Sequence, residues 1–326
     1  MKQRLSAIFY FYLSIAIFGG VISLFTWWAL QMPVDEDFHV FLPLYLLMKI
    51  YSDAMIWWYL RKQNAARLFF YSNLGISELR LYLSVFAIDI IAFLLFVLLV
   101  KLIYFKMAAQ ILEADSMWLE FGGRKILQSI YLKLETGRVT GLLGRNGTGK
   151  SSILRMMFGT LRGQNQSVRY NGHFISHPYL EAGLIRYLPQ SPFVPEDLKV
   201  YQVCSMYKVS FAEMINYFPE LEDYEREPVR HLSGGKTRLF ETLLILLSPV
   251  HFVLLDEPFT HISPVMVEQL SKVIAELKKQ KGILISDHSY KNVLDLSDDT
   301  YLIVPVGRSL LLKNPESELK SLGYTS

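Results

Sequence analysis

Residues 144–151 decide the fold of this chain, and they read Gly144-Arg145-Asn146-Gly147-Thr148-Gly149-Lys150-Ser151. The stretch fits the pattern G-x-x-x-x-G-K-[ST] at every fixed position, and residues 138–143 before it predict a buried strand that enters the loop. The glycines let consecutive backbone N–H groups converge on anionic oxygens, and the helix that follows adds the positive end of its dipole. The sequence therefore predicts a phosphate-binding loop in which Lys150 contacts the β- and γ-phosphates and Ser151 binds Mg²⁺. On this motif alone, a chance glycine-rich turn is the alternative.

Two polar motifs follow this loop along the chain. Gln190 ends the run Tyr-Leu-Pro-Gln at 187–190, just after apolar residues, where an amide side chain can reach a metal ion or a water. The run Leu-Ser-Gly-Gly-Lys at 232–236 opens a predicted helix. In that run Ser233 is the expected N-cap, and Gly234 and Gly235 expose N–H groups to an anion.

Two apolar strands then end in polar pairs. Residues 252–255 are all aliphatic or aromatic, which is typical of a parallel strand that is buried on both faces, and Asp256 and Glu257 follow them. At the carboxyl end of this strand we expect Asp256 to bind Mg²⁺ through water and Glu257 to polarise the attacking water. Residues 282–286 predict a second such strand, which delivers Asp287 and His288 to the same edge.

Taken in this order, the motifs resemble the ATP-binding cassette of ABC transporters, from about Ser116 to the C-terminus. GTPases and small-molecule kinases share the first motif but lack Leu-Ser-Gly-Gly between a glutamine and an aspartate–glutamate pair. The resemblance implies an ATPase that binds ATP and Mg²⁺, with catalysis assigned to Glu257, His288 and Gln190. The nucleotide contacts it implies are Phe121, Gly144, Asn146, Gly147, Thr148, Gly149, Lys150, Ser151, Ser152, Ser233, Gly234 and Gly235. The Mg²⁺ ligands it implies are Ser151, Gln190 and Asp256.

Some details of the cassette are less regular. Phe121 is expected to stack on adenine, and Trp118 nearby is the alternative. Ser263 stands where most members of the family have an aspartate, in a loop that crosses the interface between two cassettes, so communication between the two ATP sites is left open. The single cysteine, Cys204, has no partner for an internal disulfide and is expected to pack in the interior.

The predicted fold class is α/β for residues 107–326, as a P-loop NTPase of the ABC cassette type. It comprises a mixed sheet, an antiparallel β part near residues 117–140, and a helical subdomain at 191–231. Residues 301–304 and 309–312 predict a closing β-hairpin.

Residues 1–106 are predicted to form an all-α membrane region of about three hydrophobic helices. The whole chain is 52% hydrophobic, and the excess lies in this part. Segments 8–30 and 81–105 are long enough to cross a bilayer, whereas 38–60 is weaker because it carries Lys49 and Asp53, which can pair at i and i+4. Buried core helices are the alternative for all three segments.

The orientation of these helices stays open. Basic residues before the first segment and after the second, with acids at 35–37, place the N-terminus in the cytoplasm. A third crossing would then carry the cassette outside, away from ATP. Three solutions remain: segment 81–105 does not cross fully, segment 38–60 does not cross, or the N-terminus lies outside.

Two functions fit these patterns. The chain is predicted to be the ATP-hydrolysing subunit of an ABC transporter at the inner or plasma membrane, with its cassette in the cytoplasm. Its expected partners are a second cassette, as a homodimer or paired subunit, and a separate permease subunit, because three spans are too few for a permease. The alternative is a membrane-tethered regulatory ATPase that controls a partner without moving a solute. Nucleic acid is not implied, since the net charge is only +3 and no basic stripe stands out.

Overall fold

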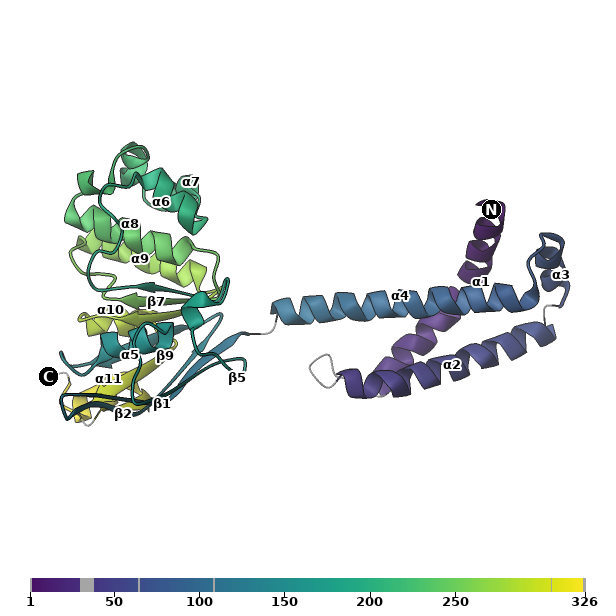
Figure 1. The fold of residues 1–326 in the computed structure, drawn as a ribbon, viewed down its shortest axis with the longest axis horizontal. Coiled ribbons are helices and arrows are strands. Elements are labelled where there is room, and N and C mark those ends of the chain that lie inside the picture. Colours follow the sequence, from purple (N-terminus) through teal and green to yellow (C-terminus); the bar gives the residue numbers. More distant parts are fainter. Residues whose placement is uncertain (1, 30–37, 64, 108, 306, 325–326) are drawn as a thin grey trace. The chain divides into compact units, whose positions relative to one another are not determined.

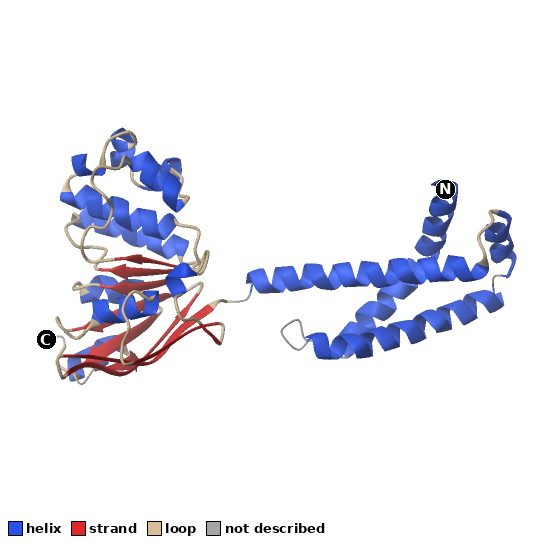
Figure 2. Ribbon diagram, viewed as in Figure 1, coloured by secondary structure: helices blue, strands red, loops and turns tan. Residues whose placement is uncertain are grey.

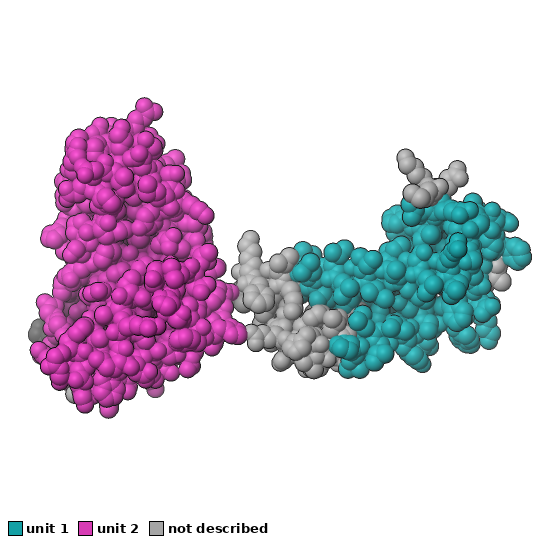
Figure 3. Space-filling model, viewed as in Figure 1, with its two compact units in different colours: residues 1–108 teal, residues 109–326 magenta. Residues whose placement is uncertain are grey.

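The computed structural model describes residues 2–29, 38–63, 65–107, 109–305 and 307–324. The chain divides into two compact units, Met1–Ala108 and Ala109–Ser326, which Figure 3 shows in teal and magenta. The first unit is helical and the second combines helices with two sheets (Figures 1 and 2). The acids at 35–37, which enter the charge-based orientation, lie outside the described residues.

The helical unit contains α1 (Lys2–Ala29), α2 (Phe38–Gln63), α3 (Ala65–Asn73) and α4 (Glu78–Met107). The three long helices coincide with the three predicted hydrophobic segments. Among the described residues, one stretch is long and apolar enough to cross a membrane by length and composition, at 78–100 in α4. Membrane crossing by α1 and α2 stays a prediction.

A polar contact that the sequence does not reveal joins the three long helices. Lys49 and Asp53 were expected to be able to pair at i and i+4 along α2, and they form an ion pair at 4.0 Å. The Lys49 ammonium is also ion-paired with Asp89 of α4, and it donates hydrogen bonds to Ser23 Oγ (2.7 Å) and Gly19 O (3.2 Å) of α1. These closer partners could not be predicted, because they depend on which residues of the other helices packing brings close.

The second unit is built around a six-stranded sheet in the order β10-β9-β3-β8-β7-β6. All neighbouring strands are parallel except β10, which is antiparallel to β9. Every residue of the central strands β3, β7 and β8 is buried, since alternate side chains enter separate apolar cores on the two faces. The strands are β3 (Val139–Gly144), β6 (Ile185–Leu188), β7 (Phe252–Asp256), β8 (Gly282–Ser286), β9 (Asp299–Val304) and β10 (Arg308–Leu312).

An antiparallel four-stranded sheet, in the order β2-β1-β4-β5, shares one of these cores with α5 (Lys150–Phe158). Its strands are β1 (Ile111–Phe121), β2 (Arg124–Glu135), β4 (Asn165–Tyr170) and β5 (His173–Phe174). The predicted antiparallel part is thus present but larger, because β4 and β5 join it across more than forty residues of chain. The predicted closing hairpin is confirmed, with Arg308 opposite Val304 in β10 and β9.

A helical subdomain lies between β6 and β7. It contains α6 (Val200–Tyr207), α7 (Phe211–Tyr217) and the 3-10 helices Pro219–Tyr224 and Val229–His231. Cys204 is buried there, as predicted.

The remaining helices are the 3-10 turn Pro178–Leu180, α8 (Gly234–Leu247), α9 (Pro264–Leu277), α10 (Tyr290–Leu296) and α11 (Pro315–Ser321). Because β3, β6, β7 and β8 are parallel, their carboxyl ends meet at one edge of the sheet, where ligands of such folds bind.

Candidate functional site

The phosphate-loop sequence forms a tight turn between β3 and α5. Gly147 and Gly149 have φ of 78° and 94°, in the left-handed region that favours glycine. A Cβ on Gly149 would also lie 2.8 Å from Leu127 Cδ2, so a larger residue would displace β2. Lys150 folds back across the turn and donates a hydrogen bond to Gly144 O at 2.7 Å. Burial lowers the pKa of Lys150, and the nearby acids, Glu257 first, oppose that shift.

The C-terminal segment lies against this loop. Tyr324 offers its hydroxyl oxygen to the Gly144 N–H at 3.1 Å, and the Arg145 guanidinium donates to Gly323 O at 3.0 Å. These contacts join residues that are 178 or more positions apart. The start of the phosphate loop is thus held by the last described turn of the chain.

Asp256 ends β7 and is fully buried. Its Oδ2 accepts a hydrogen bond from the Tyr187 hydroxyl at 3.2 Å, whereas its Oδ1 has no hydrogen-bond partner among the described residues. Burial raises the pKa of Asp256, and hydrogen bonds from Ser151 and Tyr187 oppose that shift.

A buried carboxylate oxygen without a partner, beside a serine hydroxyl, fits a hard cation that prefers oxygen ligands. Within the described ranges, no group of three or more His, Cys, Asp or Glu side chains forms a metal cage. Asp256 and Ser151 offer oxygen atoms of the kind that Mg²⁺ prefers, and this ion keeps several waters and takes few protein ligands.

Glu257 holds an unusual backbone conformation directly after β7. Its φ is 55°, a region that non-glycine residues rarely adopt, and its N–H donates to Ser286 O at 2.6 Å. Its side chain is 8% exposed, and Oε1 lies 2.7 Å from His288 Nε2. This strained turn aims the carboxylate at the loop after β8, where about half of the His288 side chain is exposed.

A buried arginine in α8 ties these loops together. Arg238 donates to the carbonyl oxygens of Pro189 (2.7 Å) and Glu257 (2.9 and 3.2 Å), and also to that of Asp256. One turn further along, fully buried Glu241 accepts hydrogen bonds from the N–H groups of residues 193 and 194, at 2.8 and 3.0 Å. Helix α8 is therefore bonded both to the turn that carries Glu257 and to the chain on either side of Gln190.

A cavity of about 510 Å³ collects most of the predicted nucleotide contacts. Trp118 does not line it, and the ammonium of Lys125 lies over its ring at 5.3 Å. Phe121 does line it and is 56% exposed. Asp256 is buried beside the cavity without lining it. The lining residues are Phe121, Ile126, Asn146, Gly147, Gly149, Lys150, Ser151, Ser152, Gln190, Glu257 and His288.

The predicted contacts in 232–236 do not line this cavity. Ser233 is the N-cap of α8, as predicted, with its Oγ accepting from Lys236 N at 3.4 Å. Gly235 packs so closely that a Cβ would lie 2.7 Å from His261 O. Ser233 and Gly234 are exposed. Beyond His261, Ser263 caps α9 in the same way, and its Oγ accepts from Met266 N at 3.4 Å.

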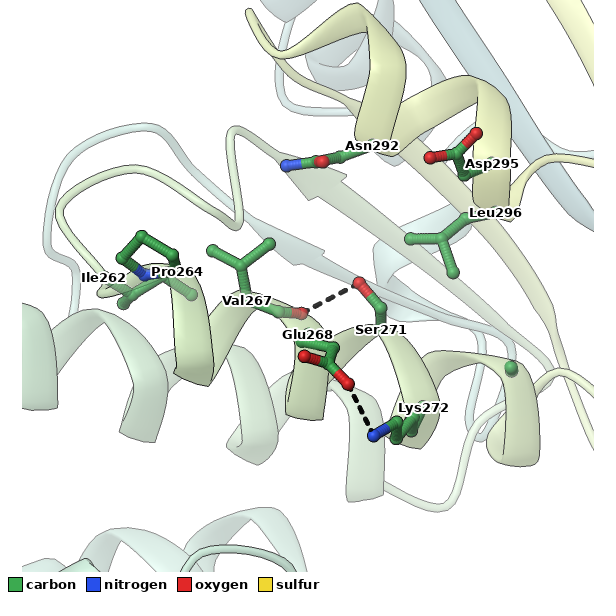
Figure 4. A pocket seen from close by; sticks show the side chains of 10 residues that line it. Ile262, Pro264, Val267, Glu268, Ser271, Lys272, Asn292, Asp295 and Leu296 are labelled. Carbon is green, nitrogen blue, oxygen red and sulfur yellow. Dashed lines mark hydrogen bonds and ion pairs between the residues drawn. The ribbon is translucent and has the colours of Figure 1, made fainter.

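A larger cavity of about 590 Å³ lies elsewhere, between α9 and α10 (Figure 4). Its lysine, Lys272, is ion-paired with Glu268 at 2.7 Å, and the hydroxyl of Ser271 is bonded to Val267 O at 2.8 Å. These polar groups are satisfied within α9, so this cavity offers phosphate no free cation comparable to Lys150.

Several residues at the site escaped sequence reasoning. They are Tyr187, Arg238, Glu241 and Tyr324. Two of them did carry a signal: Arg238 and Glu241 interrupt an apolar helix at i and i+3, and paired charges on a buried face predict internal partners. Asp287 accepts hydrogen bonds from the N–H groups of residues 259 and 289, which links the loops after β7 and β8.

The sheet order, the phosphate loop between β3 and α5, and the acids at the end of β7 together define a P-loop nucleoside triphosphatase. The sequence profile of the family described as ABC transporter matches residues 127–260. A probable ABC transporter ATP-binding protein of Azorhizobium caulinodans is 31% identical over 224 residues, covering 64% of this chain and 79% of the relative. The chain therefore belongs to the ABC transporter family and carries its ATP-hydrolysing cassette.

Other similar proteins agree with this assignment. The lipopolysaccharide export system ATP-binding protein LptB of Haemophilus influenzae is 30% identical over 222 residues, covering 63% of this chain and 91% of that protein. Among solved structures, an ATP-binding subunit of an ABC transporter superposes with a TM-score of 0.57 at 21% identity, covering 65% of this chain and 93% of that one. A nucleotide-free ATP-binding cassette gives 0.56 at 21% identity, covering 66% and 95%. These two likenesses show the fold.

Proposed function

We propose that this protein is the ATP-binding and ATP-hydrolysing subunit of a transporter, held at the cytoplasmic face of the membrane by its own helical unit. One observation carries the proposal: a single cavity gathers a phosphate loop, a glutamine, a buried glutamate and a histidine from four different loops. Cassettes of this family work in pairs with a permease. The cavity residues recognise nucleotide, so the partner permease sets the transported substrate.

Nucleotide binding follows from the lining of the cavity. Phe121 offers an exposed ring on which adenine stacks, and the loop N–H groups with the dipole of α5 hold the phosphates. Lys150 exchanges its contact with Gly144 O for a phosphate oxygen, and the anionic phosphates offset the burial that lowers its pKa. Asp256, Ser151 and Gln190 would hold Mg²⁺, and this ion would neutralise charge on the transferred phosphoryl group.

Hydrolysis is assigned to Glu257 and His288. The carboxylate of Glu257 faces the cavity and orients a water by accepting its proton, while His288 at 2.7 Å fixes the position of the carboxylate. Arg238 holds the backbone carbonyl of Glu257, so the carboxylate keeps its aim without rearrangement when nucleotide binds.

The residues at 233–235 complete the site from a second cassette. They lie at the N-terminus of α8, whose exposed N–H groups attract an anion, yet they do not line the cavity of their own chain. In a pair of cassettes, each α8 N-terminus faces the γ-phosphate held by the other chain. ATP thereby joins the two cassettes, and its hydrolysis releases them.

The substitution Glu257→Gln tests this function in the full-length protein in lipid vesicles. Glutamine keeps the shape of the side chain but cannot accept the proton, so we expect hydrolysis to slow on the order of a hundredfold or more with little change in ATP affinity. For the same variant solubilised in detergent, ATP should also shift the protein to a dimer on size-exclusion chromatography. Glu268→Gln, an exposed change on α9, is the control and should hydrolyse ATP normally. Wild-type turnover in Glu257→Gln would remove this residue from the mechanism.

A further inference from the structure

Among the described side chains of the helical unit, two carboxylates and one ammonium group are buried: those of Asp53, Asp89 and Lys49. Lys49 is 3% exposed, and each of the three N–H donors of its ammonium group has a partner. The group is ion-paired with Asp89 and donates hydrogen bonds to Gly19 O and Ser23 Oγ. The carboxylate of Asp89 has a second partner, because it also accepts a hydrogen bond from the Tyr12 hydroxyl. Gly19 makes this close approach possible, because a Cβ there would lie 3.0 Å from Asp89 Oδ1.

Asp53 is left without such a partner. It lies one turn after Lys49 on α2 and is 4% exposed, but its Oδ1 is 4.0 Å from the Lys49 ammonium. Its Oδ2 has no hydrogen-bond partner within the described part of the chain. Two carboxylates therefore share one ammonium, and an unpaired buried charge is costly in an apolar medium.

Asp53 faces an elongated apolar groove between α2 and α4. The groove has a volume of about 240 Å³, and the hydroxyl of Tyr82 on its wall also lacks a partner among the described residues. Each wall is a stripe at helical spacing, and the longer stripe, from Leu79 to Ile90, extends roughly 16 Å along its axis. The lining residues are Ile50, Asp53, Ala54, Trp57, Leu79, Tyr82, Leu83, Phe86 and Ile90.

We propose that this groove receives a membrane helix of the partner permease, and that a lysine or arginine of that helix pairs with Asp53. The groove runs along the helices, which suits another helix better than a compact headgroup, and its one ionisable group calls for a cation. Tyr82 supplies a second polar group on the wall of the groove. The inference rests on the proposed function in taking the helical unit as membrane-embedded and the partner as the permease.

A second copy of this chain does not supply the cation. Residues 8–30 carry no charge, and the Lys49 ammonium is already occupied. In the apolar part of α4 the one lysine or arginine is Lys101, twelve residues beyond Asp89 and so about 18 Å further along the helix. We therefore assign the complementary charge to another protein.

Photo-cross-linking of the full-length protein in phosphatidylcholine vesicles tests this docking site. A benzophenone amino acid replaces Leu83 in the groove or, as a control, Val21, which is exposed on α1 and does not line the groove. The probes are poly-leucine membrane peptides with a central lysine or a central leucine. We expect the lysine peptide to cross-link at least tenfold more than the leucine peptide at position 83 and equally at position 21.

Two variants decide whether the charge and the groove are responsible. Asp53→Asn should abolish the preference for the lysine peptide while leaving the melting temperature unchanged or raised, because it removes an unpaired charge. Ala54→Phe should reduce cross-linking of both peptides by filling the groove without touching the charge. Equal labelling by both peptides in the wild type, or a preference that survives Asp53→Asn, would overturn the proposal. Strong destabilisation by Asp53→Asn would also overturn it, by making Asp53 a structural partner of Lys49.

Two measurements on the same vesicles separate this inference from the proposed function. Flotation of the protein with the vesicles and hydrolysis of ATP test the membrane-held ATPase. Protein that floats and hydrolyses ATP but shows no preference for the lysine peptide refutes the docking site alone. Protein that stays out of the vesicles refutes the membrane placement itself.

Discussion

Removing the carboxylate of Glu241 should destabilise the cassette far more than removing its charge. Glu241 Oε1 accepts two backbone N–H groups, at 2.8 and 3.0 Å, in a fully buried position. Hydrogen bonds to a charged group contribute about 1.5–3 kcal/mol each. Glu241→Ala leaves both N–H groups unpaired and opens a small void, so we expect a loss of roughly 3–5 kcal/mol. Glu241→Gln keeps an acceptor oxygen in place and should cost about 1 kcal/mol.

Cys204 provides the assay, because it is the only cysteine and is buried in the helical subdomain. Burial raises the pKa of its thiol to about 12, so a fluorogenic maleimide reacts only when the cassette opens. Thermal melts of the full-length protein in detergent then report unfolding of this unit. A loss of 3–5 kcal/mol corresponds to a drop on the order of 10 °C in Tm for a domain of this size.

The control is Glu268→Ala on α9, an exposed glutamate whose removal should shift Tm by less than about 2 °C. Glu241→Ala melting together with this control would refute the reasoning. So would a Glu241→Gln variant as unstable as Glu241→Ala, since the charge and not the hydrogen bonds would then carry the effect.

Three further outcomes are expected. Lys150→Ala should weaken ATP affinity at least about tenfold, since the phosphates lose their buried cation; an unchanged titration with fluorescent ATP would exclude the assigned contact. Tyr324→Phe should lower the free energy of unfolding by about 1 kcal/mol by leaving the Gly144 N–H unpaired, and a melt identical to wild type would contradict this. Burial lowers the pKa of Lys281 from 10.5 to about 8. Between these two pH values the Lys281 amine is therefore mostly neutral in the folded chain but still protonated in the unfolded chain. Relative to Lys281→Met, wild-type stability should therefore rise over that window by on the order of 3 kcal/mol, and parallel curves for the two proteins would contradict the shift.

The parts of the fold that depend on local pattern were predictable. The turn at 144–151 has glycines where φ is positive, and the apolar runs at 252–255 and 282–286 are buried strands. Their carboxyl ends meet at one edge because the strands are parallel, which is why Gln190, Glu257 and His288, from three separate parts of the chain, line one cavity. The family pattern then indicated which side chains to expect there.

The parts that depend on long-range packing were not predictable. The helical period of α2 suggested Asp53 as the partner of Lys49, but the position of Asp89 depends on how α4 packs against α2. In the same way, the contact of Tyr324 with Gly144 depends on where the chain returns after β10. Such pairs have no spacing in the sequence that marks them.

Ser263, the N-cap of α9, is a position where the charge of the loop can change with little effect on the stability of the fold. Aspartate and asparagine cap a helix about as well as serine does, and Pro264 is favourable at the first helical position whichever of them precedes it. Exchange among these three residues is therefore nearly neutral for folding, while it adds or removes a negative charge in the loop whose His261 O packs against Gly235. Ser263→Asp restores the residue typical of the family, and it offers protein engineers a way to vary this charge while the helix behind it stays intact.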